Sequence, residues 1–358
     1  MWDDYPPTYR AAEVEHLVRA IKAGESAALV GLSGAGKSNV LGFIANAAGV
    51  AARLPNTRLV AVDCNRLREP SPNALFAAMR RGLGQTALAD GTRDPLDALD
   101  DALAAGLREK TFAKVCFVLD RFDSLTAQNP DSLFGNLRSL RDAHKFKLSF
   151  ITGTRRPLDA RTEFAELVYA NTIWLGCLSE SDARWNVARY AARKELVWGD
   201  EVATALIGVS RGYASFLRAS CEACADTGDP NAAAAHPAVR ARVDEFWADA
   251  PSEEEIRLSG LAGLPLLYAG RAATFNTSQL TSKEMALLDF LQAHPNAVCE
   301  KDDIIRAVWS EDKAFGKGIR DDSLAQLARR LREKIEPDPN APRWVITVPG
   351  RGYKFVAG

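Results

Sequence analysis

Apolar positions follow two different rhythms along the first half of the chain. Short apolar runs bounded by polar residues predict buried β-strands. Between them lie longer segments whose apolar positions recur every three to four residues, which predicts helices packed through one face. Strands alternating with helices are typical of a parallel sheet covered on both faces, so we expect an α/β fold. The expected strands are 27–30, 58–63, 115–120, 147–152 and 171–175, and the expected helices are 8–23, 39–46, 72–84, 94–109 and 131–143.

Residues 176–250 show helical periodicity without a convincing strand pattern. We therefore expect an all-helical lid that packs on the preceding α/β domain. Residues 251–275 combine a run of glutamates with glycine-rich and polar segments, which is typical of a connection between domains. The expected lid helices are 180–196, 200–208, 213–226 and 236–248.

The pattern changes again from about residue 276. Thr281 and Glu284 have the spacing of a capping box before an apolar stripe, and two further helices are expected at 300–309 and 322–336. Strand-like segments then flank the glycine-rich Pro-Gly-Arg-Gly at 349–352, which predicts a β-hairpin. Three helices followed by a hairpin predict a winged helix-turn-helix domain.

Composition places the chain among ordinary globular proteins. Hydrophobic residues make up 47% of its 358 residues and charged residues 25%, which suits two or three domains with separate cores. The start lacks a basic segment followed by an apolar one, and no apolar run is long enough to cross a bilayer, so we expect a cytoplasmic protein with no membrane partner. The six cysteines are scattered, and we interpret Cys221 and Cys224 as buried thiols at helical spacing.

The stretch from Gly31 to Ser38 matches the spacing G-x-x-x-x-G-K-[ST]. It lies between an expected strand and an expected helix, which is the context that a phosphate-binding loop requires. Its glycines let successive backbone N–H groups surround a phosphate, while Lys37 reaches the β- and γ-phosphates and Ser38 coordinates Mg²⁺. We therefore predict that the chain binds ATP or ADP with Mg²⁺. The expected nucleotide-binding residues are Gly31, Ser33, Gly34, Ala35, Gly36, Lys37, Ser38 and Asn39.

Asp120 ends an expected strand and is expected to act with Ser38 at the metal ion. Along the chain another strand lies between the phosphate loop and this acid, which resembles the additional-strand branch of P-loop ATPases. Hydrolytic relatives usually place a glutamate after the acid, whereas Arg121 follows here and the next acid is Asp123. This sequence, Leu-Asp-Arg-Phe-Asp, resembles the STAND class of signalling ATPases. The resemblance implies that Asp123 is the catalytic base, and a structural cap of the loop is the alternative.

The end of the expected strand at 147–152 is similar to the sensor segment of the same class. The resemblance implies that Thr154 bonds the γ-phosphate or the attacking water and that Arg155 neutralises charge there, with a simple polar turn as the alternative for each. Cys177 stands where these ATPases usually carry a proline against adenine. These irregularities indicate slow or absent turnover, so we expect a nucleotide-controlled switch.

The last part of the chain resembles the effector domain of OmpR/PhoB-type regulators over almost all its length. A helical wheel of 322–336 places its leucines on one face and leaves the opposite face for a major groove. The resemblance implies binding of double-stranded DNA through this helix and the hairpin. The matching segments are 280–284, 307–309, 327–335 and 346–354. The expected DNA contacts are Gln326, Arg329 and Arg330 at bases, Arg332 and Lys334 at phosphates, and Arg351 at the minor groove or its backbone.

Charge indicates that any DNA-binding surface is local, because the whole chain has a net charge of only −1. From Arg329 to the end, seven basic residues stand against three acidic ones, a net charge of +4, whereas residues 281–328 carry −3. The positive field is therefore confined to the third helix and the hairpin. A winged helix that contacts protein is the alternative.

Together these features predict an ATP-binding switch that acts as a DNA-binding transcriptional regulator. Nucleotide state would control engagement of the winged helix, or assembly of a homo-oligomer in the ATP state, and a separate sensor protein is a further expected partner. The alternatives are an initiator ATPase of the origin-recognition type and a signalling or defence ATPase whose winged helix binds protein. The expected domains are 1–175 for ATP binding, 176–250 for the lid, 251–275 for the linker and 276–358 for the winged helix.

Overall fold

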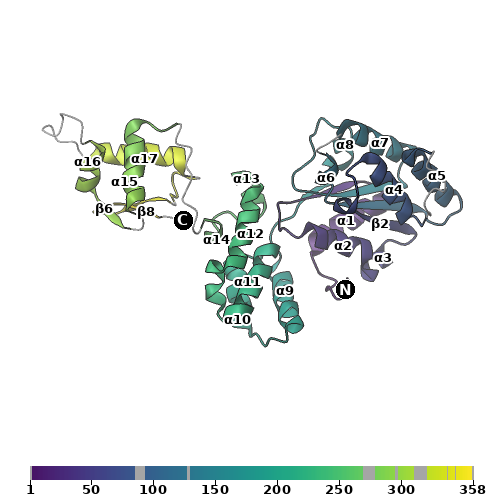
Figure 1. Ribbon diagram of the computed structural model, residues 1–358, viewed down its shortest axis with the longest axis horizontal. Helices are drawn as coiled ribbons and strands as arrows, with labels where there is room; N and C mark the ends of the chain where they lie inside the picture. The colour runs from purple at the N-terminus through teal and green to yellow at the C-terminus, as the bar shows by residue number, and fades with distance from the viewer. Residues whose placement is uncertain are drawn as a thin grey trace. The chain divides into compact units, whose positions relative to one another are not determined.

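Two compact units, Met1–Ala262 and Gly263–Gly358, make up the fold (Figure 1). Each unit buries its own hydrophobic core. The computed structural model describes residues 2–84, 93–126, 130–268, 279–294, 297–309, 321–336, 338–342 and 344–356.

The first unit is built on a parallel sheet of five strands. They are β1 (Ala27–Val30), β2 (Thr57–Asp63), β3 (Lys114–Asp120), β4 (Leu148–Thr154) and β5 (Thr172–Trp174). Their order in the sheet is β2-β3-β4-β1-β5, so β4 lies between the strand that leads into the phosphate loop and the strand that ends in Asp120. Every residue of β4 is buried, as expected for a central strand covered on both faces. The α/β fold expected from the sequence is confirmed.

Helices cover both sides of this sheet. They are α1 (Ala11–Ala23), α2 (Lys37–Asn46), α3 (Ala48–Arg53), α4 (Pro72–Gly82), α5 (Pro95–Arg108), α6 (Asp123–Thr126), α7 (Pro130–Ala143) and α8 (Ala165–Tyr169). In Figure 1, α4, α5 and α7 lie on one side of the sheet, and α2 and α3 lie on the other. Ser71 caps α4 by accepting a hydrogen bond from the Ala74 N–H at 3.3 Å, and Pro72 follows as its first residue.

The lid consists of helices at the positions that its periodicity predicts. They are α9 (Glu180–Arg193), α10 (Asp200–Ser210), α11 (Ala214–Thr227) and α12 (Pro237–Ala248), with a 3₁₀ turn η2 (Pro230–Ala235) between the last two. Helices α11 and α12 pack through Phe216 and Phe246, whose rings meet edge to face at 5.8 Å. Tyr213, just before α11, joins the same buried aromatic cluster.

The segment after the lid continues the first unit. Helix α13 (Glu253–Leu258) begins at a capping box formed by Ser252 and Glu255. The Glu255 carboxylate also accepts a hydrogen bond from Arg156 Nε at 2.6 Å, which ties α13 to the end of β4. The expected linker 251–275 therefore includes a helix that is folded into the first unit. Helix α14 (Pro265–Tyr268) follows and belongs to the second unit, and the expected linker beyond it lies outside the described residues.

Arg10 connects several parts of the first unit. Its guanidinium donates to the carbonyl oxygens of Cys177 at 2.8 Å, Gly176 at 2.9 Å and Ala35 at 3.3 Å, and its backbone N–H donates to the Asp182 carboxylate at 3.1 Å. Arg10 is only 3% exposed and has a positive φ of 48°. These hydrogen bonds hold an otherwise unfavourable backbone conformation in place.

After α14, the described part of the second unit contains three longer helices and a three-stranded antiparallel sheet. They are α15 (Ser282–Ala293), α16 (Lys301–Val308), α17 (Asp321–Ile335), β6 (Val298–Glu300), β7 (Val345–Val348) and β8 (Gly352–Phe355), with sheet order β6-β8-β7. The capping box of Thr281 and Glu284 is present. Strand β6 was not expected, and it approaches β8 so closely that a Cβ at Gly352 would lie 2.0 Å from the Cys299 carbonyl oxygen. The winged helix expected from the sequence is confirmed.

Replacing Arg10 with methionine removes the donor for several buried carbonyl groups while keeping an apolar side chain of similar length. We expect this change to lower the free energy of unfolding of the first unit by about 3 kcal/mol, because buried acceptors lose their partner. Hydrogen exchange of the intact chain in increasing urea would measure it. Arg19→Met, on the exposed side of α1, is the matched control and should change stability by less than about 0.5 kcal/mol. Equal effects of the two variants would contradict the role given to Arg10.

Candidate functional site

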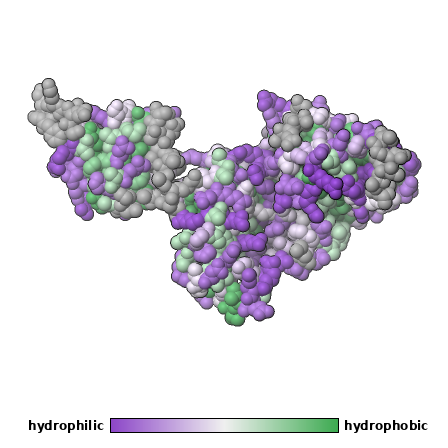
Figure 2. Space-filling model, viewed as in Figure 1, coloured by the Kyte–Doolittle hydropathy of each residue, from purple (hydrophilic) through white to green (hydrophobic). Residues whose placement is uncertain are grey.

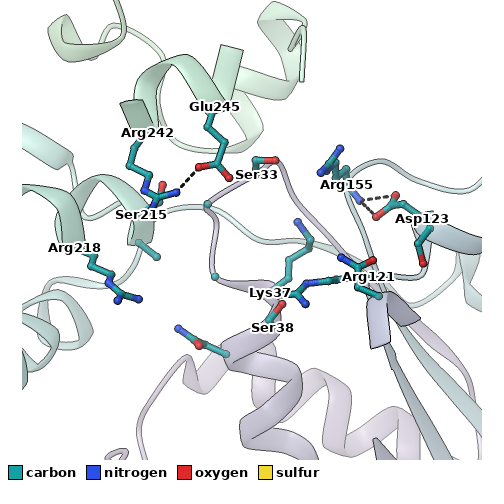
Figure 3. Close-up of a pocket in the computed structure, with 16 residues that line it drawn as sticks. Ser33, Lys37, Ser38, Arg121, Asp123, Arg155, Ser215, Arg218, Arg242 and Glu245 are labelled. Carbon is teal, nitrogen blue, oxygen red and sulfur yellow. Dashed lines mark hydrogen bonds and ion pairs between the residues drawn. The ribbon is translucent and has the colours of Figure 1, made fainter. Parts of the chain in front are cut away.

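A cavity of about 650 Å³ opens where the phosphate loop faces the lid (Figure 3). The phosphate loop and the start of α2 form one wall, the ends of β3 and β4 form a second, and helices α11 and α12 form a third. Its described lining comprises Ser33, Gly34, Gly36, Lys37, Ser38 and Asn39 from the loop and α2, Asn65, Arg121, Asp123, Ser124 and Arg155 from the strand ends, and Ala214, Ser215, Arg218, Arg242 and Glu245 from the lid. The sheet edge and the lid therefore share one cavity.

The phosphate loop has the backbone shape that its glycines predict. Gly34 and Gly36 have φ angles of 84° and 98°, which side chains rarely tolerate. Helix α2 begins directly afterwards at Lys37, so its first N–H groups and its partial positive charge lie at the cavity. A Cβ at Gly34 would lie 2.0 Å from the Ser215 Oγ of the lid. The same glycine thus permits the loop conformation and the close approach of the lid.

Lys37 points along the loop toward its carbonyl oxygens. Its Nζ donates to the carbonyl of Gly31 and, at 3.3 Å, to that of Leu32. Burial lowers the pKa of Lys37 below its ordinary value, and the nearby carboxylates of Asp123 and Asp249 act in the opposite direction. An ammonium group that is partly desolvated and bonded only to carbonyls is suited to receive a phosphate.

The expected catalytic acid and the expected sensor arginine meet at the cavity. Both carboxylate oxygens of Asp123 accept hydrogen bonds from the Arg155 backbone N–H, at 3.0 and 3.1 Å. Asp120 is the last residue of β3, and its Oδ1 accepts from the Arg121 N–H at 2.9 Å. The structure therefore brings Asp123 and Arg155 into contact and shows that the carboxylate of Asp123 orders the end of β4.

Thr154 and Cys177 are enclosed by other parts of the protein. Thr154 is fully buried, and its hydroxyl lacks a hydrogen-bond partner among the described residues; it is not part of the cavity lining. The Cys177 Sγ donates to the Ser259 carbonyl at 3.3 Å, and Arg10 occupies the neighbouring carbonyl groups. The segment expected beside adenine is thus filled by contacts within the protein.

The lid holds the phosphate loop by hydrogen bonds that sequence reasoning missed. Asp249 Oδ2 accepts from the Ser33 N–H at 2.7 Å, the Tyr213 hydroxyl donates to the Ser33 carbonyl at 2.8 Å, and the Ser215 N–H donates to the Gly34 carbonyl at 3.0 Å. Asp249 is nearly buried and also pairs with Arg155 at 3.6 Å. Ser33 and Asp249 are so far apart in the chain that periodicity could not have connected them.

Positive charge dominates the cavity, which suits a polyphosphate. Five basic side chains line it, against two acidic ones among the described residues. The basic ones are Lys37, Arg121, Arg155, Arg218 and Arg242, and the acidic ones are Asp123 and Glu245. Within the described ranges, no group of three or more His, Cys, Asp or Glu side chains is arranged to hold a metal ion. Mg²⁺ usually takes one or two protein oxygens together with phosphate oxygens and waters, so Ser38 and Asp120 remain chemically suitable.

The second unit presents a polar face on α17. Leu324, Leu327 and Leu331 are buried, whereas Gln326, Arg329 and Arg330 are exposed, in agreement with the helical wheel. Arg329 Nε pairs with Glu333 at 3.0 Å on the same exposed face. Glutamine and arginine side chains have the hydrogen-bonding groups that recognise adenine and guanine edges.

Arg332, Lys334 and Arg351 contact other parts of the second unit. Arg332 donates to the Val345 carbonyl at 2.8 Å and to the Thr347 hydroxyl at 2.7 Å, so it joins α17 to the hairpin. Lys334 Nζ pairs with Glu284 at 2.6 Å. Arg351 at the hairpin tip pairs with Glu300 at 2.6 Å but stays well exposed. Arg332 and Lys334 lie at the border of the buried face, and this is why they bond the protein itself.

Two family models match the chain, one within each of its two units. Residues 21–159 match a family model described as an AAA domain, and residues 276–355 match the model of the C-terminal domain of transcriptional regulatory proteins. The chain joins an AAA-type P-loop domain to an OmpR/PhoB-type winged-helix domain. An ATPase-type domain and a DNA-binding domain of the regulator type are therefore combined in one protein.

Individual relatives cover parts of this arrangement. The chain is 42% identical over 77 residues to YcbL, an uncharacterized transcriptional regulatory protein of Bacillus subtilis, and 37% identical over 90 residues to the transcriptional regulatory protein YvrH of the same species. These matches cover 22% and 25% of this chain, and the chain spans only about a third of the length of each relative, 32% and 35%.

Solved structures resemble the chain over nearly its whole length. A Walker-type ATPase of Pyrococcus abyssi aligns with 99% of this chain and 97% of its own, at 14% identity and a TM-score of 0.50, which shows a shared fold. The Aeropyrum pernix ORC1 protein in complex with DNA aligns with 99% and 91% of the two chains, at 13% identity and a TM-score of 0.46. None of the helices in the described ranges has both the length and the apolar character needed to cross a bilayer.

The lowered pKa of Lys37 predicts that affinity for ATP depends on pH. A bound phosphate favours the charged ammonium, so binding raises the pKa of Lys37 again. Affinity for ATP should be greatest while Lys37 is protonated in the free protein, and it should fall as pH rises through that lowered pKa. Calorimetry in alkaline buffers of different ionisation enthalpy should detect proton uptake on binding. Lys37→Arg keeps its charge at these pH values and should abolish the uptake; the same uptake in both proteins would contradict the assignment.

Proposed function

We propose that this protein is an ATP-controlled, DNA-binding transcriptional regulator. ATP with Mg²⁺ binds the cavity of the first unit, and the nucleotide state governs how the winged helix of the second unit engages DNA. The observation that carries this proposal is the set of hydrogen bonds between the lid and Ser33 and Gly34, because phosphate binding acts on the same stretch of backbone. Residues 1–175 serve as the ATP-binding domain, 176–250 as the lid, 251–275 as the connection and 276–358 as the DNA-binding domain.

Each part of the cavity has a role in this scheme. N–H groups of the phosphate loop and of the start of α2 bind the phosphates together with the Lys37 ammonium, while Ser38 and Asp120 hold Mg²⁺. The N–H groups of Gly31 and Ser33 are already bonded to Thr154 and Asp249. Hydrolysis is slow and secondary to binding. Arg121 stands where a glutamate would orient water, and the carboxylate of Asp123 is already bonded to the backbone of Arg155.

The magnitudes are compatible with switching. ATP at a thousand times its dissociation constant stabilises the state that binds it by roughly 4 kcal/mol. Three lid–loop hydrogen bonds at about 1 kcal/mol each are of similar strength. Nucleotide binding can therefore rearrange the lid, provided that the two lid positions differ in affinity for ATP by that amount.

DNA binding rests on the exposed face of α17. Gln326, Arg329 and Arg330 contact base edges, and Arg351 contacts the sugar-phosphate backbone near the hairpin tip. Arg332 and Lys334, which bond within the second unit, position the helix and the hairpin. A homo-oligomer in the ATP state would bring several winged helices to neighbouring sites and make binding steep in ATP. A separate sensor protein would supply the signal.

The test is selection of genomic DNA fragments by the intact protein with ATP, with ADP and without nucleotide. We expect particular fragments to be enriched with ATP by wild type and lost with Lys37→Ala, which removes the phosphate ligand. Arg329→Ala with Arg330→Ala should lose the same enrichment, because both arginines are proposed to contact base edges. Arg306→Ala, an exposed arginine on α16, is the matched control and should behave as wild type.

Two results would contradict this function. Enrichment that is the same with ATP, with ADP and without nucleotide would separate DNA binding from the cavity. Binding that lacks sequence preference and disappears in moderate salt would leave a nucleotide-binding protein whose winged helix contacts another protein.

Asp249 offers a direct test of the link between the lid and the loop. Its carboxylate places a negative charge against the phosphate loop, 2.7 Å from the Ser33 nitrogen. Asp249→Asn keeps a hydrogen-bond acceptor but removes that charge, so affinity for ATP and ADP should both rise several-fold. Calorimetric titration of the two nucleotides would measure this. Asp244→Asn, exposed on α12, should leave both affinities unchanged. A fall in affinity with Asp249→Asn would show that the carboxylate supports nucleotide binding.

A further inference from the structure

Arg121 takes a conformation that directs its side chain into the cavity. It has a positive φ of 55°, and its N–H donates to Asp120 Oδ1 at 2.9 Å. Figure 3 shows the side chain extending toward Ser38 and Lys37, where a phosphate chain and its metal ion would meet. The strained backbone is thus stabilised by the same acid that is expected at the metal ion.

Asp63 is the present partner of this guanidinium. Strands β2 and β3 pair in register so that Asp63 lies opposite Asp120, and Arg121 follows directly. Its Nη1 lies 3.1 Å from Asp63 Oδ2 and 3.4 Å from Oδ1, and Asp63 Oδ1 also accepts from the Asn65 N–H at 3.1 Å. The side chains of Arg121 and Asp63 are 49% and 29% exposed. An ion pair this exposed contributes little to stability, so the arginine can exchange it for a stronger anion at small cost.

We infer that Arg121 is a ligand of the γ-phosphate, which makes the cavity select a nucleoside triphosphate over a diphosphate, and that Asp63 holds the guanidinium in the absence of that phosphate. This inference rests on the proposed nucleotide binding. A guanidinium forms two parallel hydrogen bonds with a phosphate, which is more highly charged than a single carboxylate. A diphosphate leaves the end of the cavity near Arg121 without an anion, so the arginine stays on Asp63.

The position of Arg121 also explains how a triphosphate would persist. A guanidinium cannot take a proton from water, because it stays protonated at all accessible pH values. An arginine directly after Asp120 therefore binds the γ-phosphate without activating its attack. Asp63 provides the second stable position, so one side chain has a distinct partner in each nucleotide state.

The test compares ADP with the non-hydrolysable β,γ-imido analogue of ATP, each with Mg²⁺, by calorimetry on the intact protein. Arg121→Ala should weaken the affinity for the analogue by roughly 10- to 100-fold, as expected for loss of a charge-assisted hydrogen bond. The affinity for ADP should change by less than about 2-fold. Arg121→Lys keeps the positive charge and should lose less of the affinity for the analogue. Asp63→Asn retains the acceptor for the Asn65 N–H but releases Arg121. It should therefore raise the affinity for the analogue several-fold and leave the affinity for ADP unchanged.

A double-mutant cycle provides the decisive control. The effect of Asp63→Asn should disappear when Arg121 is already alanine, because Asp63 acts only by holding that arginine. Equal losses of ADP and the analogue with Arg121→Ala, or an effect of Asp63→Asn that persists without Arg121, would overturn this inference alone. Failure of the wild-type protein to bind either nucleotide would overturn the proposed function as well.

Discussion

The hydrogen bonds between the lid and the phosphate loop are the contacts on which the first unit's arrangement depends. Backbone groups of Ser33 and Gly34 in the phosphate loop form hydrogen bonds with Asp249, Tyr213 and Ser215 of the lid. Glycine at position 34 is required twice, once for its positive φ and once for the approach of Ser215. Lid position and loop conformation are therefore coupled through a few atoms.

Charge around the cavity is arranged for binding more clearly than for hydrolysis. Basic side chains converge from the loop, the strand ends and the lid, while the two acids best placed to assist chemistry, Asp120 and Asp123, bond neighbouring backbone N–H groups. A site of this kind holds a polyphosphate strongly and has little to activate water. In the proposed function, such a site acts through a change of conformation rather than through turnover.

The two sides of α17 in the second unit have different surroundings. Arg332 bonds the hairpin and Lys334 bonds α15, so these two side chains hold α17 in place against the rest of the unit. The neighbouring Gln326, Arg329 and Arg330 project from the opposite face and carry the groups that distinguish bases. One helix can present both sets of side chains, because its period of 3.6 residues places adjacent positions in different surroundings.

The sequence by itself determined what depends on local order: the five strands of the parallel sheet, its longer helices, the phosphate loop, the capping box at Thr281 and the buried face of α17. Each follows from residues that are neighbours along the chain. Tertiary structure alone decided which distant groups meet. It placed β4 between β1 and β3, brought Asp249 to Ser33, buried Thr154 outside the cavity lining and paired Arg121 with Asp63. Such pairings depend on strand register and on how the lid packs against the sheet domain, and the hydrophobic pattern of the sequence predicts neither.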